Sequence, residues 1–197
     1  MRDGERRTSA VTRSNRETQV KVRVNLDGGG SASVRTGVRF LDHMLVSFST
    51  HSLIDLQVRA TGDLQHHLVE DVALTVGEAI NRALGERLGI KRFGFSIVPM
   101  DDALVLSAVD LVKRPHASIS LKLNRVMIED APREDLEHFF QSLVGSIGST
   151  VHIKVLEGRN DHHKFEAAVK AFGLALRGAI SADPQRRGRI PSSKGTA

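Results

Sequence analysis

Two adjacent histidines precede a glutamate in the segment QHHLVED, residues 65–71. On a helix, His66 and Glu70 stand at i, i+4, while His67 and Glu70 stand at i, i+3, so one carboxylate neighbours both imidazoles. Neutral imidazole and carboxylate are ligands that divalent transition metals favour. Adjacent helical positions point about 100° apart, so we expect the two histidines to serve two different ions.

The same pattern of candidate ligands occurs in both halves of the chain. LDHM (41–44), an alternating segment and QHHLVED correspond to LEHF (136–139), a second alternating segment and DHHKFEA (161–167). A purely structural duplication would preserve apolar core positions most readily. Here polar, mutually compatible metal ligands recur. The eight candidate ligands are His43, His66, His67, Glu70, His138, His162, His163 and Glu166.

The helical spacing also suggests how these ligands divide between two ions. A histidine and a glutamate at i, i+3 can share an ion, as the Glu-x-x-His pairs of di-iron bundles do. The first histidine of each pair points elsewhere, so we expect it to serve the other ion. The expected sets are His43, His67, Glu70 and His162 for one ion, and His138, His163, Glu166 and His66 for the other. Nitrogen and oxygen donors suit Mn, Fe, Co, Ni or Zn.

Strands and helices must position these side chains. Apolar residues at helical spacing predict helices over 69–84 and 165–180, and shorter ones over 40–51 and 135–147. Alternation of apolar and polar residues predicts strands at 20–26, 54–60, 118–123 and 151–156, and 103–111 reads as a more buried strand. The sequence DGGG (27–30) favours a hairpin between early strands. The helix, strand and HHxxE helix follow one another twice.

Composition places the chain among globular proteins and limits its partners. Of its 197 residues, 40% are hydrophobic and 26% charged, no apolar run is long enough for a membrane helix, and we expect a cytoplasmic protein. The absence of cysteine excludes disulfides and thiolate ligands. The net charge of +5 suits an anionic partner, but eight Phe without Trp or Tyr offer little for stacking bases. We therefore expect a small acidic ligand rather than nucleic acid.

Several basic and hydroxyl side chains are candidates for binding that anion. Arginine forks onto two phosphate oxygens, lysine supplies a point charge, and serine hydroxyls can complete the cradle. Taken singly, each is more often a solvated surface group. The candidates are Arg92, Arg114, Lys170 and the residues Ser192, Ser193 and Lys194 of the terminal segment SSKG.

These motifs, in this order, resemble the imidazoleglycerol-phosphate dehydratase family. The match runs from RET (16–18) through FLDHML, HHLVED, RFG, PMDDALV and VDL to EHFF, GRNDHHKFEA and PSSKG, and covers nearly the whole chain. The paired HHxxE segments with FLDHM and the terminal motif are highly specific in combination. RFG alone would mean nothing.

The resemblance implies a lyase with two Mn²⁺ ions per active site. It would remove water from D-erythro-imidazole glycerol phosphate, giving imidazole acetol phosphate in histidine biosynthesis. The departing proton sits on a carbon without an adjacent carbonyl, and metals that bind the ring as imidazolate would open a route through a diazafulvene-like intermediate. Glu17 is implied as the general acid or base. The implied phosphate ligands are Arg92, Arg114, Lys170, Ser192, Ser193 and Lys194.

The resemblance also implies the fold and the assembly. The fold is α+β, an internal duplication of a four-stranded sheet backed by two helices, ribosomal protein S5 domain 2-like and pseudo-two-fold. We expect a flexible leader at 1–12, repeats at 13–90 and 91–182, and a tail at 183–197 that contributes to the substrate site. Family members form homo-oligomers of 24 subunits with active sites at subunit interfaces.

Two other functions fit parts of the pattern. A dinuclear metallohydrolase would use two metals, basic side chains and a carboxylate for an in-line displacement, and would release phosphate where a dehydratase retains it. A basic nucleic-acid-binding or metal-storage protein of S5-like fold would bind without turnover. The scarcity of aromatic residues and the ordered repeat of ligands argue against this second alternative.

Overall fold

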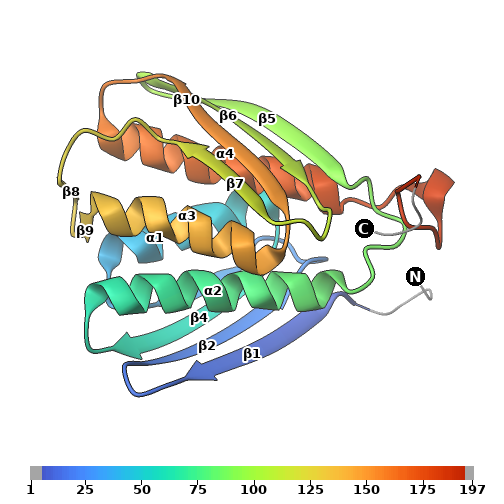
Figure 1. Cartoon of the computed structure of the whole chain (residues 1–197), viewed down its shortest axis with the longest axis horizontal. Helices are drawn as coiled ribbons and strands as arrows, with labels where there is room; N and C mark the ends of the chain where they lie inside the picture. Colours follow the sequence, from blue (N-terminus) through green and yellow to red (C-terminus); the bar gives the residue numbers. More distant parts are fainter. Residues whose placement is uncertain (1–5, 194–197) are drawn as a thin grey trace.

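The chain folds into two units with the same order of elements, three strands, a helix, a strand and a helix (Figure 1). The computed structural model describes residues 6–193. The first unit comprises β1 (Thr8–Ser14), β2 (Thr18–Asn25), β3 (Ala32–Arg35), α1 (Arg39–Ser52), β4 (Asp55–Gly62) and α2 (Gln65–Leu84). The second comprises β5 (Phe93–Met100), β6 (Ala103–Asp110), β7 (His116–Ser120), α3 (Arg133–Ile147), β10 (Thr150–Glu157) and α4 (Asp161–Ile180), with the short strands β8 (Met127–Ile128) and β9 (Ala131–Pro132) inserted before α3.

Each unit contains one four-stranded sheet of the same topology. The strand orders are β1-β2-β4-β3 and β5-β6-β10-β7, and only the last pair in each sheet is parallel. Alternation along β2 sets the two faces, since Val20, Val22 and Val24 are buried whereas Lys21 and Arg23 are exposed. The predicted α+β fold with an internal duplication is confirmed.

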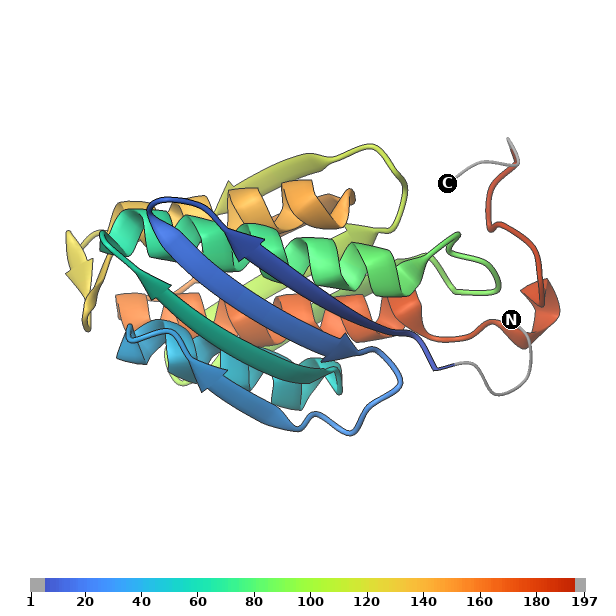
Figure 2. The same cartoon turned by 90° about the horizontal axis from the view of Figure 1, so that it is seen from below.

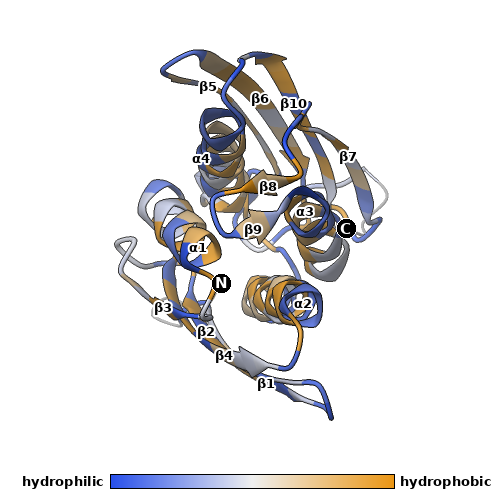
Figure 3. Ribbon diagram, turned by 90° about the vertical axis from the view of Figure 1, so that its left-hand side faces the viewer, coloured by the Kyte–Doolittle hydropathy of each residue, from blue (hydrophilic) through white to orange (hydrophobic). Residues whose placement is uncertain are grey.

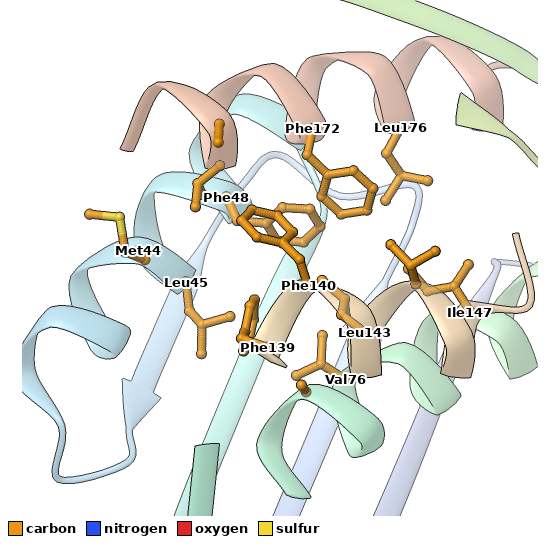
Figure 4. Close-up of a cluster of buried hydrophobic side chains, with 14 of the residues drawn as sticks. Met44, Leu45, Phe48, Val76, Phe139, Phe140, Leu143, Ile147, Phe172 and Leu176 are labelled. Atoms are coloured by element: carbon orange, nitrogen blue, oxygen red, sulfur yellow. The ribbon is translucent and has the colours of Figure 1, made fainter. Parts of the chain in front are cut away.

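The helices of the two units pack against each other between the sheets. α1 packs on α4, and α2 packs on α3, so each helix meets a helix of the other unit (Figure 3). The core between them is aromatic, and Figure 4 shows Phe48, Phe139, Phe140 and Phe172 gathered there. The rings of Phe140 and Phe172 lie edge to face at 6.1 Å.

Glycines at matching positions allow the helices to approach at both crossings. A Cβ on Gly77 of α2 would lie 2.6 Å from Ser146 Cβ and 2.7 Å from the Leu143 carbonyl oxygen of α3. A Cβ on Gly173 of α4 would lie 3.3 Å from the Phe48 carbonyl oxygen of α1. The second crossing is therefore slightly more open than the first.

The turn between β8 and β9 ties the two units together at one end of the molecule. The Asp130 carboxylate accepts hydrogen bonds from the backbone N–H groups of Arg39 and Phe40, at 2.8 and 2.9 Å. Gln65, the first residue of α2, donates to the Asp130 carbonyl oxygen at 2.8 Å. Asp130 thus satisfies two otherwise unpaired donors at the start of α1.

Two predictions about the start of the chain were wrong. β1 begins at Thr8, so residues 8–12, expected to belong to a flexible leader, instead pair antiparallel with β2. Residues 1–5 of that leader lie outside the described residues. The early hairpin joins β1 to β2 at residues 15–17, whereas the DGGG turn leads into β3, which pairs parallel with β4. Among residues 6–193, no helix has both the length and the apolar character needed to cross a bilayer.

Candidate metal centre

The starts of α2 and α4, which carry the HHxxE segments, lie at the same end of the molecule (Figure 1). Val69, Val72 and Val76 are buried on α2, and His66 and Glu70 of the same helix lie beside His138 of α3. Because α2 meets α3, and α4 meets α1, each HHxxE segment faces the first helix of the other unit. The pairing of helices therefore decides which ligands meet.

One cluster of possible metal ligands joins α1 to α4. Its members are His43, His162 and Glu166, whose ligand atoms all lie within 4.8 Å of one another. Glu166 Oε2 lies 3.1 Å from Nε2 of His162 and 3.8 Å from Nε2 of His43. Lys170 Nζ contacts the other oxygen, Oε1, at 2.9 Å. Glu166 therefore turns one oxygen toward the two imidazoles and the other toward a lysine.

The second cluster is the counterpart of the first and joins α2 to α3. Its members are His66, Glu70 and His138, again within 4.8 Å of one another. Glu70 Oε1 lies 3.3 Å from Nε2 of His138, and the rings of His66 and His138 stack at 5.5 Å. Both clusters thus combine one first-helix histidine with a histidine and a glutamate from the other unit.

This grouping corrects part of the expected division of ligands. His43 does lie with His162, and His138 with His66, as expected. The two glutamates are exchanged relative to the expectation, because each shares its cluster with the i−4 histidine and not with the i−3 histidine. His67 and His163 belong to neither cluster within the chain. Instead, they point toward carboxylates of the neighbouring turns.

Every histidine of the two HHxxE segments has a carboxylate at Nδ1. A carboxylate only accepts, so the proton sits on Nδ1 and the lone pair of Nε2 is left for a metal. The carboxylates are Asp135 for His66, Asp63 for His67, Glu129 for His162 and Asp102 for His163, at N···O distances of 2.7, 3.0, 3.1 and 2.6 Å. With Nδ1 protonated, two lone-pair atoms face each other between His162 and Glu166, an arrangement that suits a shared cation.

The electrostatics of the ligand residues favour ionised carboxylates. Burial alone would raise the pKa of the Glu166 carboxyl, but the hydrogen bond and positive charge of Lys170 bring it below its ordinary value. The backbone N–H of Arg159 and the His163 ring lower the pKa of Asp102. The hydrogen bond to Asp63 raises the pKa of His67.

Glu17, the candidate general acid or base, lies at the same end as both clusters. It occupies the turn between β1 and β2, and its Oε2 lies 3.7 Å from Nδ1 of His67. Its side chain is 54% exposed, which leaves it accessible to a substrate. The β5–β6 turn holds Asp101 and Asp102 next to His163 in the corresponding place of the second unit.

Most of the candidate phosphate ligands lie at the opposite end of the molecule. Arg92 precedes β5, where its guanidinium pairs with both oxygens of Asp110 and donates to the Pro191 carbonyl oxygen at 2.9 Å. Arg114 lies in the β6–β7 connection, and Ser192 and Ser193 follow in the tail (Figure 1). Lys194 lies outside the described residues. Among the members of this set that lie within residues 6–193, only Lys170 contacts a residue of a metal-ligand cluster, namely Glu166.

Sequence reasoning did not single out the carboxylates that hold the histidines. Asp102 stands in the motif PMDDALV and Asp63 stands four residues before His67, a spacing that brings helical neighbours together. Asp135 and Glu129 carried no such signal, because their contacts with His66 and His162 depend on how distant helices and loops pack.

Similarity to known proteins identifies the family of this chain. A family model described as imidazoleglycerol-phosphate dehydratase matches residues 36–176, which include all eight candidate metal ligands. The chain belongs to the imidazoleglycerol-phosphate dehydratase family. The imidazoleglycerol-phosphate dehydratase of Methanothermobacter thermautotrophicus is 48% identical over 192 residues, which cover 96% of this chain and 97% of the relative.

Solved structures of imidazoleglycerol-phosphate dehydratases share the fold. The Staphylococcus aureus structure matches with a TM-score of 0.82 at 32% identity and covers 89% of this chain and 99% of that one. The Pyrococcus furiosus structure matches with a TM-score of 0.81 at 38% identity, over 95% and 100% of the two chains. The chain is thus a hydro-lyase, with the dehydratase activity in histidine biosynthesis that defines imidazoleglycerol-phosphate dehydratases.

Proposed function

We propose that the chain dehydrates D-erythro-imidazole glycerol phosphate to imidazole acetol phosphate with two Mn²⁺ ions in each active site. The observation that carries this proposal is the matched pair of clusters, each with two imidazole nitrogens and a carboxylate oxygen within 4.8 Å. The substrate's imidazole has two ring nitrogens, which suits a site with two metal positions. Nitrogen and oxygen donors of this kind fit Mn²⁺.

The residues that would hold the metals are those of the two clusters, together with the remaining histidine of each HHxxE segment. When bound, the ions would supply positive charge that stabilises the substrate ring as protons and hydroxide leave. His67 and His163 are 31% and 27% exposed, and their Nδ1 atoms are already held by carboxylates. We assign their Nε2 atoms to metals shared with a neighbouring subunit.

We assign Glu17 the proton transfers. The proton that departs sits on a carbon without an adjacent carbonyl, so the reaction needs a positioned base. Glu17 is exposed, has the His67 ring as its only ion-pair partner among residues 6–193, and lies at the end where both clusters lie. It can remove the proton and later return one to the enol as that enol becomes the ketone.

We propose Arg92, Arg114, Lys170, Ser192, Ser193 and Lys194 as the residues that bind the substrate phosphate. Among the members that the structure describes, all except Lys170 lie at the end opposite the metal-ligand clusters or in the tail that leads away from it (Figure 1). A single chain therefore does not place the ring of one substrate at the metal-ligand clusters and the phosphate of the same substrate at these residues. This separation supports active sites between subunits, in a homo-oligomer of 24. We place the activity in the cytoplasm, where a phosphorylated substrate is retained.

Turnover by metal-stripped protein, with and without added Mn²⁺, tests the proposal. We expect imidazole acetol phosphate only when Mn²⁺ is added, and loss of at least a hundredfold in kcat/KM for the Glu70→Gln, Glu166→Gln double variant. Glu78→Gln with Glu157→Gln removes two carboxylates outside the clusters and serves as the matched control. Mn²⁺-independent turnover would refute the metal requirement.

Product analysis in the same assay separates the alternatives. Release of inorganic phosphate in step with substrate loss would favour a dinuclear metallohydrolase, because a dehydratase leaves the phosphate ester intact. Salt-sensitive binding of mixed RNA without any turnover would favour the nucleic-acid-binding alternative.

A further inference from the structure

The outer face of the first sheet carries a row of opposed basic side chains. Lys21 on β2 lies directly opposite Arg59 on β4, and Arg59 lies directly opposite Arg35 on β3. Arg23 stands two residues along β2 on the same face, and all four side chains are exposed. α1 and α2 cover only the other face, so this face is open in the chain (Figure 2). Like charges in directly opposed positions repel and destabilise a sheet.

The second sheet shows that the fold does not require this row. Lys154 is the fifth residue of β10, as Arg59 is the fifth residue of β4. Its directly opposed neighbours are Leu106 on β6 and Ser120 on β7, neither of them charged. The same position in the same topology is therefore compatible with uncharged neighbours. The opposed cations belong to the first sheet specifically.

Within residues 6–193, none of these cations has a protein anion to neutralise it. Lys21, Arg23, Arg35 and Arg59 form no ion pair within 4.0 Å and no side-chain hydrogen bond there. The one carboxylate at the edge of the face, Asp55, is already held by the backbone N–H groups of Gly29 and Ser31 at 2.9 and 3.0 Å. The positive charge of the row is therefore uncompensated.

The surface of this face is hollowed where the basic side chains lie, which gives an anion a place to bind. Two shallow depressions share the side chains of Lys21 and Arg59 as a common wall. One is also lined by Arg23 and Gln57, and the other by Arg35 and neighbouring polar residues. Arginine and lysine together offer forked and single donors for phosphate oxygens.

We propose that this face binds an oligophosphate anion through Lys21, Arg59 and Arg35, with Arg23 beside them. Adjacent strands lie about 4.8 Å apart, so the row spans about 10 Å, more than one phosphate group needs. No aromatic side chain lies on these strands, so the ligand is recognised by charge and not by base stacking. Four cations are fewer than the roughly 6–10 phosphate contacts of nucleic-acid-binding proteins.

Calorimetric titration of the full-length, Mn²⁺-loaded protein with tripolyphosphate tests the proposal. We expect Arg59→Gln to weaken binding at least tenfold, because Arg59 has a cation opposite it on both sides. Lys154→Gln, which removes one charge at the matching position of the second sheet, should change the affinity less than twofold. Both variants lose one positive charge and keep the same metals. Chelation of Mn²⁺ and binding of tripolyphosphate at the active site therefore affect both measured affinities equally, and the difference between the two variants reports on the sheet face.

Further ligands and one stability measurement sharpen the outcome. ATP should bind within threefold of tripolyphosphate, and orthophosphate more weakly than either. Without ligand, Arg59→Gln should raise the melting temperature and Lys154→Gln should not, because only the first substitution relieves repulsion.

Equal weakening of tripolyphosphate binding by both variants, or no binding by the wild-type protein, would overturn the proposal. A short single-stranded RNA that binds tighter than tripolyphosphate, and depends on Arg59, would replace it with a nucleic-acid surface.

Discussion

Nδ1 of His66 on α2 donates a hydrogen bond to the Asp135 carboxylate on α3 at 2.7 Å, across the boundary between the two repeats. The Asp135 side chain is only 3% exposed, so its position is fixed by packing. A buried carboxylate at Nδ1 sets the ring orientation and leaves Nε2 as the coordinating atom. The contact therefore links the packing of α2 on α3 to the metal-ligand geometry of His66.

Asp135→Asn should weaken metal binding without removing a proposed ligand. The amide can present an N–H to Nδ1, which favours the tautomer with the proton on Nε2. We expect the Mn²⁺ dissociation constant to rise about 10–100-fold, as it does for other partners of metal-bound histidines. Titration followed by electron paramagnetic resonance measures this directly. The neighbouring Glu134→Gln serves as control, and equal effects of both substitutions would contradict the assigned role.

The two glycine crossings should respond differently to alanine. At Gly77 the new methyl would meet Ser146 Cβ at 2.6 Å and a backbone carbonyl at 2.7 Å, so α2 and α3 must separate. We expect Gly77→Ala to lose about 1–3 kcal/mol of stability through overpacking. Gly173→Ala meets its neighbours at 3.3 Å and gains helix propensity of up to about 1 kcal/mol, so its net change should be smaller. Urea unfolding at a fixed protein concentration compares them, and a larger loss for Gly173→Ala would be inconsistent with the packing.

Removal of the Asp130 side chain should loosen the start of α1. Asp130→Ala deletes the acceptors for the N–H groups of Arg39 and Phe40. Loss of such a cap costs about 0.5–2 kcal/mol. We expect faster hydrogen exchange at the first turn of α1, next to His43, while α3 stays protected. Asp130→Asn retains one acceptor and should show a smaller effect; unchanged exchange in Asp130→Ala would argue against capping.

The Asp55 carboxylate should make stability depend on pH in the acid range. The backbone N–H groups of Ser31 and Gly29, with the Asn25 side chain, hold the pKa of Asp55 below its ordinary value. A lowered pKa in the folded state gives stability that is present above the unfolded pKa of about 3.9 and lost as pH falls through the folded value. Asp55→Asn should therefore melt below wild type at pH 5–7, with the gap narrowing below about pH 4. A gap that stays constant down to pH 2 would exclude this origin.

The sequence predicts the helices that carry the candidate ligands well, because helical spacing is a local feature. Val69, Val72 and Val76 repeat at helical spacing, and they do face the core. The i, i+4 relation of His66 to Glu70 also follows from the sequence alone. Glu70 and Glu166 are exchanged between the expected sets because each lies with the i−4 histidine, and helical spacing alone allows either the i−3 or the i−4 histidine.

Two strands that sequence reasoning missed, β1 and β3, lack an alternating pattern of buried and exposed residues. In β1 only Val11 is buried, and the strand is held by its backbone pairing with β2. β3 has four residues and no fully buried side chain. The contact of His66 with Asp135 joins residues that are 69 positions apart, so it becomes visible only once the helices are packed.

The separation of the metal-ligand clusters from Arg92 and the tail has a genetic consequence. If an active site takes its metal ligands from one subunit and its phosphate ligands from another, two defective alleles can restore each other. A strain that produces both Glu70→Gln, Glu166→Gln chains and Arg92→Ala chains would then grow without histidine, although neither allele supports growth alone. Growth without histidine would then depend on the composition of the assembled oligomer and not on either polypeptide alone.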